Sequence, residues 1–458
     1  MKGKWKYKWV VLAFTSVALV FSACGPATTT PTATAPATEV SGTNEATNVS
    51  PTFDWKKYDG ESIKVYVADT GQLAYIQDKL SSFEDLTGIK VTIEASDVTG
   101  VRSNLPVKLT AQSSDFDVMA TFTSVDGLQF SSNGWYEPLD QYIYDTRMTN
   151  PDFDFADFPE GARNSMKVGD ETVTILWEMQ TDLIYYRKDL LEKAGLAVPT
   201  TFDGWLEAIK AVHNPDEVYG VALRGNGYQI TTPYSAFLEA YCGTWVKDGK
   251  ADINSPEAMK AWEMYGEWAK YGPPGIVTFD WQVPAQQFAQ GKIFVFLDIN
   301  LFTPTLEDPA QSTVAGKVGF APVPEGPCGQ KPFIGGWGYS INPFSKNKGA
   351  AWYFIQWATS KSLNEEMKIA GWPSPRASAW NSEEFKAKDK TPEFTATVLK
   401  SLEIASAQMN PPIAPGKQAR EIAGVVGTAA MEGKRGDELQ TIADAQNAEL
   451  QKLLDAMK

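Results

Sequence analysis

The chain has 458 residues, enough for two or more packed domains, and its 43% hydrophobic and 21% charged residues are ordinary for a soluble globular protein. The formal net charge of −15 argues against nucleic acid as a partner, because binding to phosphates requires a basic face. The single histidine, His213, rules out a metal site built from several histidines, so we expect no metal and no cofactor.

Residues 1–23 have the pattern of a secretory signal, with four early lysines, an apolar run and small residues at the end. The apolar run is too short for a comfortable membrane span, which disfavours an uncleaved anchoring helix. Residues 24–55 are rich in Thr, Pro and Ala and cannot bury enough surface to fold, so we expect a disordered tether.

Cys24 directly follows Ser-Ala at the end of this signal. The pattern resembles the lipobox of bacterial lipoproteins, although Phe21 stands where Leu is usual. The resemblance implies that Cys24 is lipidated and becomes the new N-terminus. Stable anchoring would then require more than one acyl chain.

The folded body opens with alternating strands and helices. Strands are predicted at 62–68, 89–94 and 114–120, and the helices between them at about 73–83 and 103–111. This order predicts a parallel sheet whose strands carry ligand loops at their carboxyl ends. The predicted loops are 69–72, 96–100 and 121–126, and they make Gln72 and Thr123 candidate ligand contacts.

Further elements follow in order. A strand at 172–177 ends at Trp177, and the chain is predicted to turn helical from Leu183 to Gly195, followed by a helix capped by Thr201. Later elements are predicted at 219–223 (strand), 237–241 and 256–271 (helices), 285–289 (helix), 291–298 (strand), 338–342 (strand), from 350 (helix) and within 383–458 (helices).

Two stretches carry a family resemblance. One is a Gly-Gly-Trp-Gly turn at 335–338 with the strand and helix after it, and then the stiff loop 371–376. The other is Tyr-Tyr-Arg-Lys-Asp-Leu-Leu-Glu-Lys-Ala-Gly at 185–195, followed by Pro-Thr-Thr-Phe-Asp-Gly-Trp at 199–205. They resemble the maltose-binding-like extracellular solute-binding proteins that serve ABC importers, and the resemblance covers about residues 60–458.

The resemblance implies an α/β fold of two lobes, the type II fold of periplasmic binding proteins, with a hinge between the lobes. Lobe one would comprise residues 56–180 and 317–360. Lobe two would comprise residues 181–316 and 361–458. The strand that ends at Trp177 would cross between them, which places Trp177 and Glu178 at the hinge beside the cleft.

Flat rings that cover the C–H faces of sugars are the expected core of such a cleft. Five tryptophans fall at predicted loops or strand ends, and we expect three of them to line one cleft: Trp177, Trp245, Trp281, Trp337 and Trp372. Tryptophans inside predicted helices, such as Trp262, are assigned to packing.

Three polar candidates remain. Arg376 either donates a forked pair of hydrogen bonds to a ligand or is a solvated loop residue. Asp298 ends an apolar strand, where a carboxylate is costly unless ligand hydroxyls or a capping role explains it. Glu178 and Asp182 would suit a glycosidase pair, but the resemblance is to binders, so no catalytic residue is expected.

The expected function is a monomeric, lipid-anchored solute-binding protein on the extracellular face of a bacterial membrane. It would carry a carbohydrate or polyol to the permease subunits of an ABC importer. The alternatives are another small solute (an oligopeptide, a polyamine or an anion) and a secreted glycan hydrolase. Export also predicts a disulfide between Cys242 and Cys328, the two cysteines left after Cys24, although spacing alone does not show that they meet.

Overall fold

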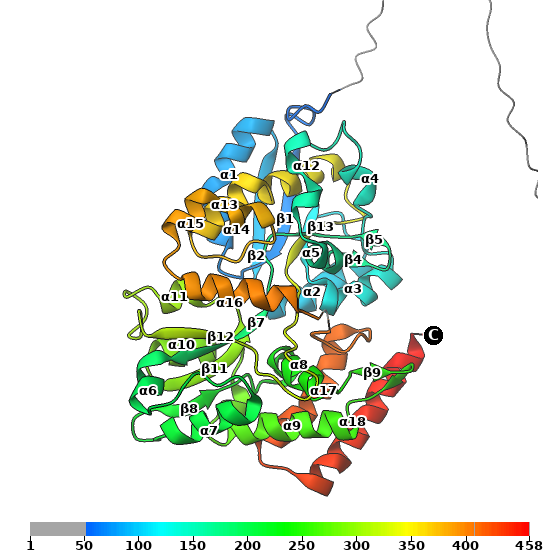
Figure 1. Cartoon of the computed structure of the whole chain (residues 1–458). Coiled ribbons are helices and arrows are strands. Elements are labelled where there is room, and N and C mark those ends of the chain that lie inside the picture. Colours follow the sequence, from blue (N-terminus) through cyan, green and yellow to red (C-terminus); the bar gives the residue numbers. More distant parts are fainter. Residues whose placement is uncertain (1–51, 407, 458) are drawn as a thin grey trace, which may run out of the picture. The chain divides into compact units, whose positions relative to one another are not determined.

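The structure is a computed structural model that describes residues 52–406 and 408–457 (Figure 1). The predicted signal segment, the lipidation at Cys24 and most of the predicted tether lie outside these residues. The tether ends before residue 55, because the rings of Phe53 and Trp55 pack on Tyr353 at centroid distances of 5.1 and 5.5 Å. Among the described helices, none is long and apolar enough to cross a membrane.

A five-stranded sheet forms the centre of the first lobe, in the order β2-β1-β3-β13-β6. Its strands are β1 (Ser62–Ala68), β2 (Lys90–Ser96), β3 (Val118–Thr121), β6 (Ile175–Leu176) and β13 (Gly338–Ile341). β1 pairs in parallel with β2 and β3, and β13 runs antiparallel to β3 and β6. The carboxyl ends of β1, β2 and β3 therefore lie at one edge, as the sequence predicts.

Helices cover this sheet (Figure 1). They are α1 (Leu73–Thr87), α2 (Val98–Thr110), α3 (Thr123–Ser132), α4 (Asp140–Ile143), α5 (Glu160–Ser165), α12 (Lys348–Ala358), α13 (Lys361–Ile369), α14 (Ala377–Asn381) and α15 (Glu383–Lys388), with the hairpin β4 (Lys167–Val168) and β5 (Glu171–Thr172). α1 ends at Gly88, whose φ of 75° is the left-handed cap that the sequence predicts. α12 is buried from Ala350 to Ala358, and its Phe354 packs edge-on against Phe83 of α1.

The prediction that all of residues 361–458 belong to lobe two is wrong for α13–α15. Glu366 of α13 accepts hydrogen bonds from Lys79 Nζ (2.8 Å) and Tyr75 Oη (2.6 Å) of α1. Arg376, just before α14, forms an ion pair with Asp157 of the first lobe (3.1 Å). These contacts hold the segment on the first lobe after α12 ends.

The second lobe is built on a four-stranded sheet in the order β12-β7-β11-β8. Its strands are β7 (Asp182–Arg187), β8 (Tyr219–Ala222), β11 (Ile293–Ile299) and β12 (Val318–Pro322). The sequence places a helix from Leu183, but the helix α6 (Lys188–Lys193) begins only after β7. β7 is buried along its whole length and pairs on both sides, so its apolar residues lack the alternation that marks a half-buried strand.

The predicted return to lobe one at residue 317 is also wrong, because β12 pairs with β7 in the second sheet. The remaining elements of the second lobe are α7 (Phe202–Val212), α8 (Thr231–Ala240), α9 (Pro256–Ala269), α10 (Val283–Ala289), α11 (Thr303–Leu306), α16 (Pro392–Glu403), α17 (Gly416–Met431), α18 (Gly436–Ala456) and the hairpin β9 (Val246–Lys247) and β10 (Lys250–Ala251). Thr201 caps α7 by accepting a hydrogen bond from Gly204 N (3.1 Å).

The chain crosses between the lobes after β6, after β12 and after α15. The first two crossings meet where Gln180 and Gly335 form an antiparallel bridge. Gly336 is required here for close approach, since a Cβ at this position would lie 2.1 Å from Glu178 O. None of Gly335, Gly336 and Gly338 has a positive φ, so the turn that the sequence predicts does not depend on the conformational freedom of glycine. The glycines are needed here because neighbouring parts of the chain pack closely against them.

Cys242, at the end of α8, is joined by a disulfide to Cys328 in the segment after β12. The Cα atoms are 5.4 Å apart, and this is the pairing that the sequence predicts. The bond ties the second crossing to the body of the second lobe.

Candidate functional site

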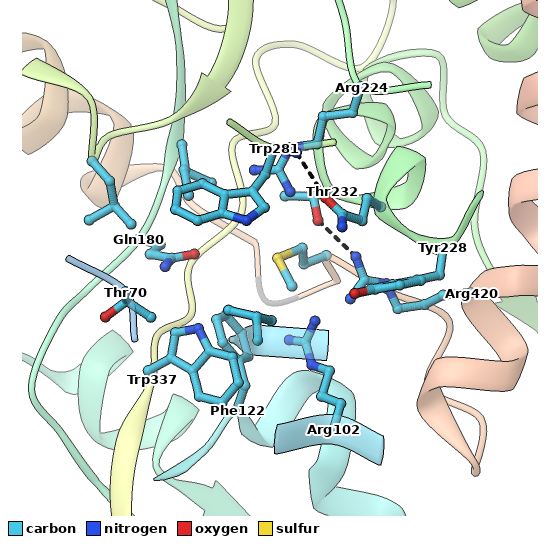
Figure 2. Close-up of a pocket in the computed structure, with 15 residues that line it drawn as sticks. Thr70, Arg102, Phe122, Gln180, Arg224, Tyr228, Thr232, Trp281, Trp337 and Arg420 are labelled. Carbon is cyan, nitrogen blue, oxygen red and sulfur yellow. Dashed lines mark hydrogen bonds between the residues drawn. The ribbon is translucent and has the colours of Figure 1, made fainter. Parts of the chain in front are cut away.

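A cavity lies between the two lobes, at the edge where the first-lobe loops end (Figure 2). The space between its walls, open solvent included, is about 520 Å³. Its lining combines rings, amides, hydroxyls and guanidiniums: Thr70, Val98, Arg102, Phe122, Gln180, Arg224, Tyr228, Gln229, Thr232, Trp281, Ile299, Leu301, Trp337, Met409 and Arg420.

Two tryptophans from different lobes face each other across this cavity. Figure 2 shows Trp281 and Trp337 on opposite sides, with Gln180 between them at one end. Trp337 is held in place by Trp177, which stacks on it at 6.3 Å and 13°, and by the edge-on ring of Phe122 at 5.7 Å. The backbone N–H of Trp281 donates to Gln229 Oε1 (2.9 Å). Rings fixed in this way can cover the apolar faces of a ligand with little loss of side-chain freedom.

The three first-lobe loops each contribute to the lining, as the strand order predicts. Thr70 follows β1, Val98 opens α2 after β2, and Phe122 follows β3. Arg102 adds a guanidinium from the second turn of α2. The carboxyl edge of the parallel strands is therefore the first-lobe wall of the site.

Gln180 reaches the cavity from the first crossing, and a buried carboxyl positions it. Gln180 Nε2 donates to Glu178 Oε1, and Gln72 Nε2 donates to Glu178 Oε2 (3.0 Å). Burial raises the pKa of Glu178 to about 8, so the group holds its proton at neutral pH. Glu178 thus orients the amide of Gln180, which lines the cavity, without adding a negative charge behind it.

A salt bridge behind the second-lobe wall fixes Arg224. Its Nε donates to Asp298 Oδ2 (2.8 Å), and Arg224 Nη2 forms a second bond to Asp298 Oδ1. Asp298 is fully buried. The carboxylate that the sequence places at a strand end is therefore paired, and its function is to hold an arginine toward the cavity.

Arg420 and Arg102 form the far end of the cavity with Tyr228 (Figure 2). Arg420 Nη2 donates to Thr232 Oγ1 (3.0 Å), and its guanidinium lies 5.0 Å from the centre of the Tyr228 ring. The guanidinium of Arg102 lies 5.0 Å from the centre of the Trp337 ring. The two cations thus rest on the faces of aromatic rings.

Of the residues that the sequence proposes as ligand contacts, Trp281 and Trp337 line the cavity. Trp177, Glu178, Gln72 and Asp298 lie behind its walls and support residues that do line it. Trp372 faces an adjoining groove that also contains Trp281.

Three of the proposed contacts serve other purposes. Trp245 is buried beside the disulfide and donates from Nε1 to Gln408 O (2.8 Å). Thr123 donates to Ser165 O inside the first lobe. Arg376 is fully buried and bonds to backbone carbonyls and to Asp157. The polar groups of all three side chains bond to other parts of the protein. A position in a predicted loop was therefore not enough to identify a ligand contact.

Sequence reasoning missed several lining residues: Arg102, Gln180, Arg224, Tyr228, Gln229, Thr232 and Arg420. A signal existed for Gln180, since it follows directly on the predicted crossing. Arg102 and Arg420 lie inside helices, where their neighbours in sequence give no hint of a cavity. In the part of the chain that the structure describes, no group of three His, Cys, Asp or Glu side chains could hold a metal ion.

The chain matches the family model described as bacterial extracellular solute-binding protein over residues 59–365. It is 28% identical over 353 residues to the erythritol/L-threitol-binding protein of Mycolicibacterium smegmatis, covering 71% of this chain and 72% of that protein. It is 25% identical over 315 residues to the mannitol-binding protein of Pseudomonas aeruginosa, covering 66% of this chain and 70% of that protein.

Solved structures show the same architecture. An ABC transporter solute-binding protein from Agrobacterium radiobacter K84, in complex with ribitol, superposes with a TM-score of 0.78 at 25% identity. The match covers 86% of this chain and 99% of that one. Maltose-bound MalE3 of T. maritima shares the fold, with a TM-score of 0.76 at 24% identity over 86% of this chain and 99% of that one. The predicted two-lobed α/β fold of type II is therefore confirmed.

Proposed function

Because the chain belongs to the bacterial extracellular solute-binding proteins, we propose that it captures a small carbohydrate or polyol and delivers it to an ABC importer. The observation that carries this proposal is the pair of indoles, Trp281 and Trp337, that face each other across a cavity rich in hydrogen-bonding groups. Rings pack on C–H faces, while amides and guanidiniums pair with hydroxyls. The erythritol, mannitol and ribitol named for its relatives have both kinds of surface.

Capture works by closure of the two lobes. Trp337 belongs to the first lobe and Trp281 to the second, so rotation about the crossings changes the distance between the two rings. A ligand between them stabilises the closed form, which is the form that the permease subunits accept. The protein acts as a monomer in this cycle.

We propose a binder and not a glycan hydrolase. A hydrolase needs two carboxyl groups on either side of the scissile bond. Among the described residues that line the cavity there is no Asp or Glu, and both Glu178 and Asp182 are fully buried behind it. A polyamine is disfavoured by the same lining, since the charges of Arg102 and Arg420 would repel it.

Calorimetric titration with erythritol, ribitol, mannitol and maltose tests the function. We expect at least one to bind, and Trp337→Ala to weaken that binding by about one to a few kcal/mol, as loss of a buried aromatic anchor does. Trp262→Phe is the control, because Trp262 is buried in α9 away from the cavity, so it should alter stability and not affinity. Unchanged affinity in a folded Trp337→Ala protein would place the ligand elsewhere, and turnover of labelled glycans would make the protein an enzyme.

The family is extracellular, and we propose that this member is held at the membrane by lipid on Cys24 after removal of residues 1–23. The support is the signal pattern and the Ser-Ala-Cys ending, which lie outside the described residues. Removal of four lysines and no acid leaves a net charge of −19 (−15 − 4). Mass spectrometry of the membrane fraction should find an acylated N-terminal Cys24; an intact N-terminus would contradict it.

A further inference from the structure

The lining of the cavity has a charge opposite to that of the whole protein. The chain carries a net charge of −15, yet the described lining contains Arg102, Arg224 and Arg420 and no acidic residue. Arg224 is neutralised by Asp298 behind the wall. The charge of the site therefore depends on the partners of the other two arginines.

Arg420 is only 2% exposed, yet the groups that accept its hydrogen bonds are neutral. Its Nε donates to Thr231 Oγ1 (2.8 Å) and its Nη2 to Thr232 Oγ1 (3.0 Å). The three other arginines that are at most 9% exposed each form an ion pair: Arg187 with Asp189, Arg224 with Asp298 and Arg376 with Asp157. Burying a guanidinium is costly without a counter-charge, so Arg420 departs from the rule that the rest of this protein follows.

Among the described residues, Arg102 lacks a hydrogen-bond acceptor for one of its donors as well as an ion pair. Its Nε is buried and has no hydrogen-bond partner, and within residues 52–406 and 408–457 its guanidinium forms no ion pair. It lies against the faces of two rings, 5.0 Å from the centre of Trp337 and 6.0 Å from that of Tyr228. A buried donor without an acceptor is destabilising unless a ligand supplies the acceptor.

Both cations lie over the ring of Tyr228, Arg102 at 6.0 Å and Arg420 at 5.0 Å from its centre, so they act on the same space. Burial lowers the pKa of Arg420 well below its ordinary value, and the charge of Arg102 lowers it further. Burial alone would raise the pKa of Tyr228, but the charge of Arg102, the hydrogen bond with Thr99 and the charge of Arg420 together lower that pKa from its ordinary value. The charge of Asp126 favours both cations, but among the described residues Asp126 forms no ion pair with either of them, and its Oδ2 accepts a hydrogen bond from Phe122 N (3.0 Å).

We infer that the site takes a polyol or sugar that carries one acidic group, a carboxylate or a phosphate, and that Arg102 and Arg420 hold this group. The inference rests on the proposed function, because the same two tryptophans cover the carbon chain of the ligand. Guanidiniums pair with planar carboxylate and with phosphate through two parallel hydrogen bonds, which supplies the missing acceptors and the missing counter-charge together.

Matched pairs of probes test this inference by calorimetry at neutral pH. The pairs are ribitol with ribonate, mannitol with mannonate, and glycerol with glycerol 3-phosphate. We expect the acidic member of at least one pair to bind about tenfold or more tightly than its neutral partner. The pair with the larger preference distinguishes a carboxylate from a phosphate.

The outcomes separate the two proposals. If neutral alditols bind as tightly as the acids or more tightly, the inference is wrong while the proposed function stands. If no member of any pair binds and no neutral sugar binds either, the proposed function fails and the inference fails with it.

Substitutions test whether Arg102 and Arg420 cause the preference for the acidic ligand. Arg102→Gln and Arg420→Gln should each reduce the preference for the acid toward one, whatever they do to the affinity for the alditol. Arg147→Gln is the control for charge, because its side chain is 60% exposed and pairs with Asp145 on the surface. A preference that survives Arg102→Gln and Arg420→Gln, or that Arg147→Gln also removes, would overturn the assignment. Arg102 is only partly buried, so its variant keeps the test open if Arg420→Gln does not fold.

Discussion

Arg376 and Arg420 are both buried arginines, yet they are held in opposite ways. Arg376 donates from Nε to Thr359 O (2.6 Å), from Nη2 to Phe153 O (2.9 Å) and from Nη1 to Asp157 Oδ2 (3.1 Å). Arg420 meets only two hydroxyls and the face of Tyr228. The first guanidinium has an ion pair and backbone acceptors, and the second forms no ion pair with a described residue.

The difference teaches how to distinguish a structural arginine from a ligand-binding one. Arg376 stands in a stiff loop beside Trp372, which makes it the better candidate on sequence grounds. The structure instead buries Arg376 among acceptors of the first lobe, while Arg420 lines the cavity and, among the described residues, forms no ion pair. An unsatisfied, cavity-facing cation is the more useful sign of a site.

The largest expected effect comes from Arg376→Met. Removing one partner of a buried ion pair leaves three backbone carbonyls without this donor and Asp157 without its counter-charge, so we expect the free energy of unfolding to fall by about 3–5 kcal/mol. Affinity for the bound polyol should stay the same in the folded fraction. Chemical denaturation measures the first quantity and calorimetry the second.

Arg147→Met is the matched control, since its ion pair with Asp145 is exposed and should contribute little to stability. If Arg376→Met is as stable as the parent but loses ligand, the comparison above is wrong and Arg376 belongs to the site.

Glu178 shows a third way to bury an ionisable group, which is to keep it neutral. Its folded pKa of about 8 lies above the ordinary 4.5, so between these pH values the folded state binds one more proton than the unfolded state. Stability due to this group therefore falls as pH rises, by about 1.4 kcal/mol per pH unit. Glu178→Gln cannot titrate, so its unfolding free energy relative to the parent should increase from pH 5 to about pH 8.

The comparison with the parent isolates Glu178, because other shifted groups such as Asp182 and Lys368 are present in both proteins. A protonated Glu178 also needs an acceptor, and Gln72 Oε1, which is buried without a partner, supplies one if the amide turns over. Parallel stability curves for variant and parent would show that Glu178 is ionised when folded.

The smallest effect is expected from Arg102→Gln in the protein without ligand. If Arg102 is held for a ligand, its removal relieves repulsion on Arg420 and should leave the unfolding free energy unchanged or raise it by up to about 1 kcal/mol. Denaturation of the ligand-free variant checks this. A loss of several kcal/mol would instead make Arg102 a structural residue like Arg376.

Much of the fold could be predicted because local patterns agree with tertiary burial. β1 alternates, α1 has helical spacing and ends at Gly88, and the strand order places the ligand loops at one edge. β7 could not be assigned, since a strand buried on both faces has the same apolar run as a buried helix. The lobe boundaries at 317 and 361 failed because they depend on pairing with distant strands and helices.

The sequence predicted residues of the site only where a large aromatic residue stands at a turn or strand end. Trp281 and Trp337 stand at turns, and they line the cavity as predicted. Trp177 and Asp298 were also predicted to contact the ligand, but they lie behind the wall and support Trp337 and Arg224. Arg102 and Arg420 come from helices of different lobes, more than 300 residues apart in sequence, and only the folded structure brings them together. That neither arginine forms an ion pair with a described residue can be known only from the folded structure.

The disulfide between Cys242 and Cys328 also determines where the chain is free to bend. The disulfide fixes the segment between β12 and Cys328 to α8, so this segment moves with the second lobe. Shortly afterwards Phe333 N donates to Asp182 Oδ1 (3.1 Å) and Gly335 pairs with Gln180, which joins two crossings into one short ribbon. Because this ribbon joins two of the three crossings, we expect the lobes to rotate about it. Gln180 belongs to this ribbon, so we expect its amide to stay beside the cavity while the lobes rotate.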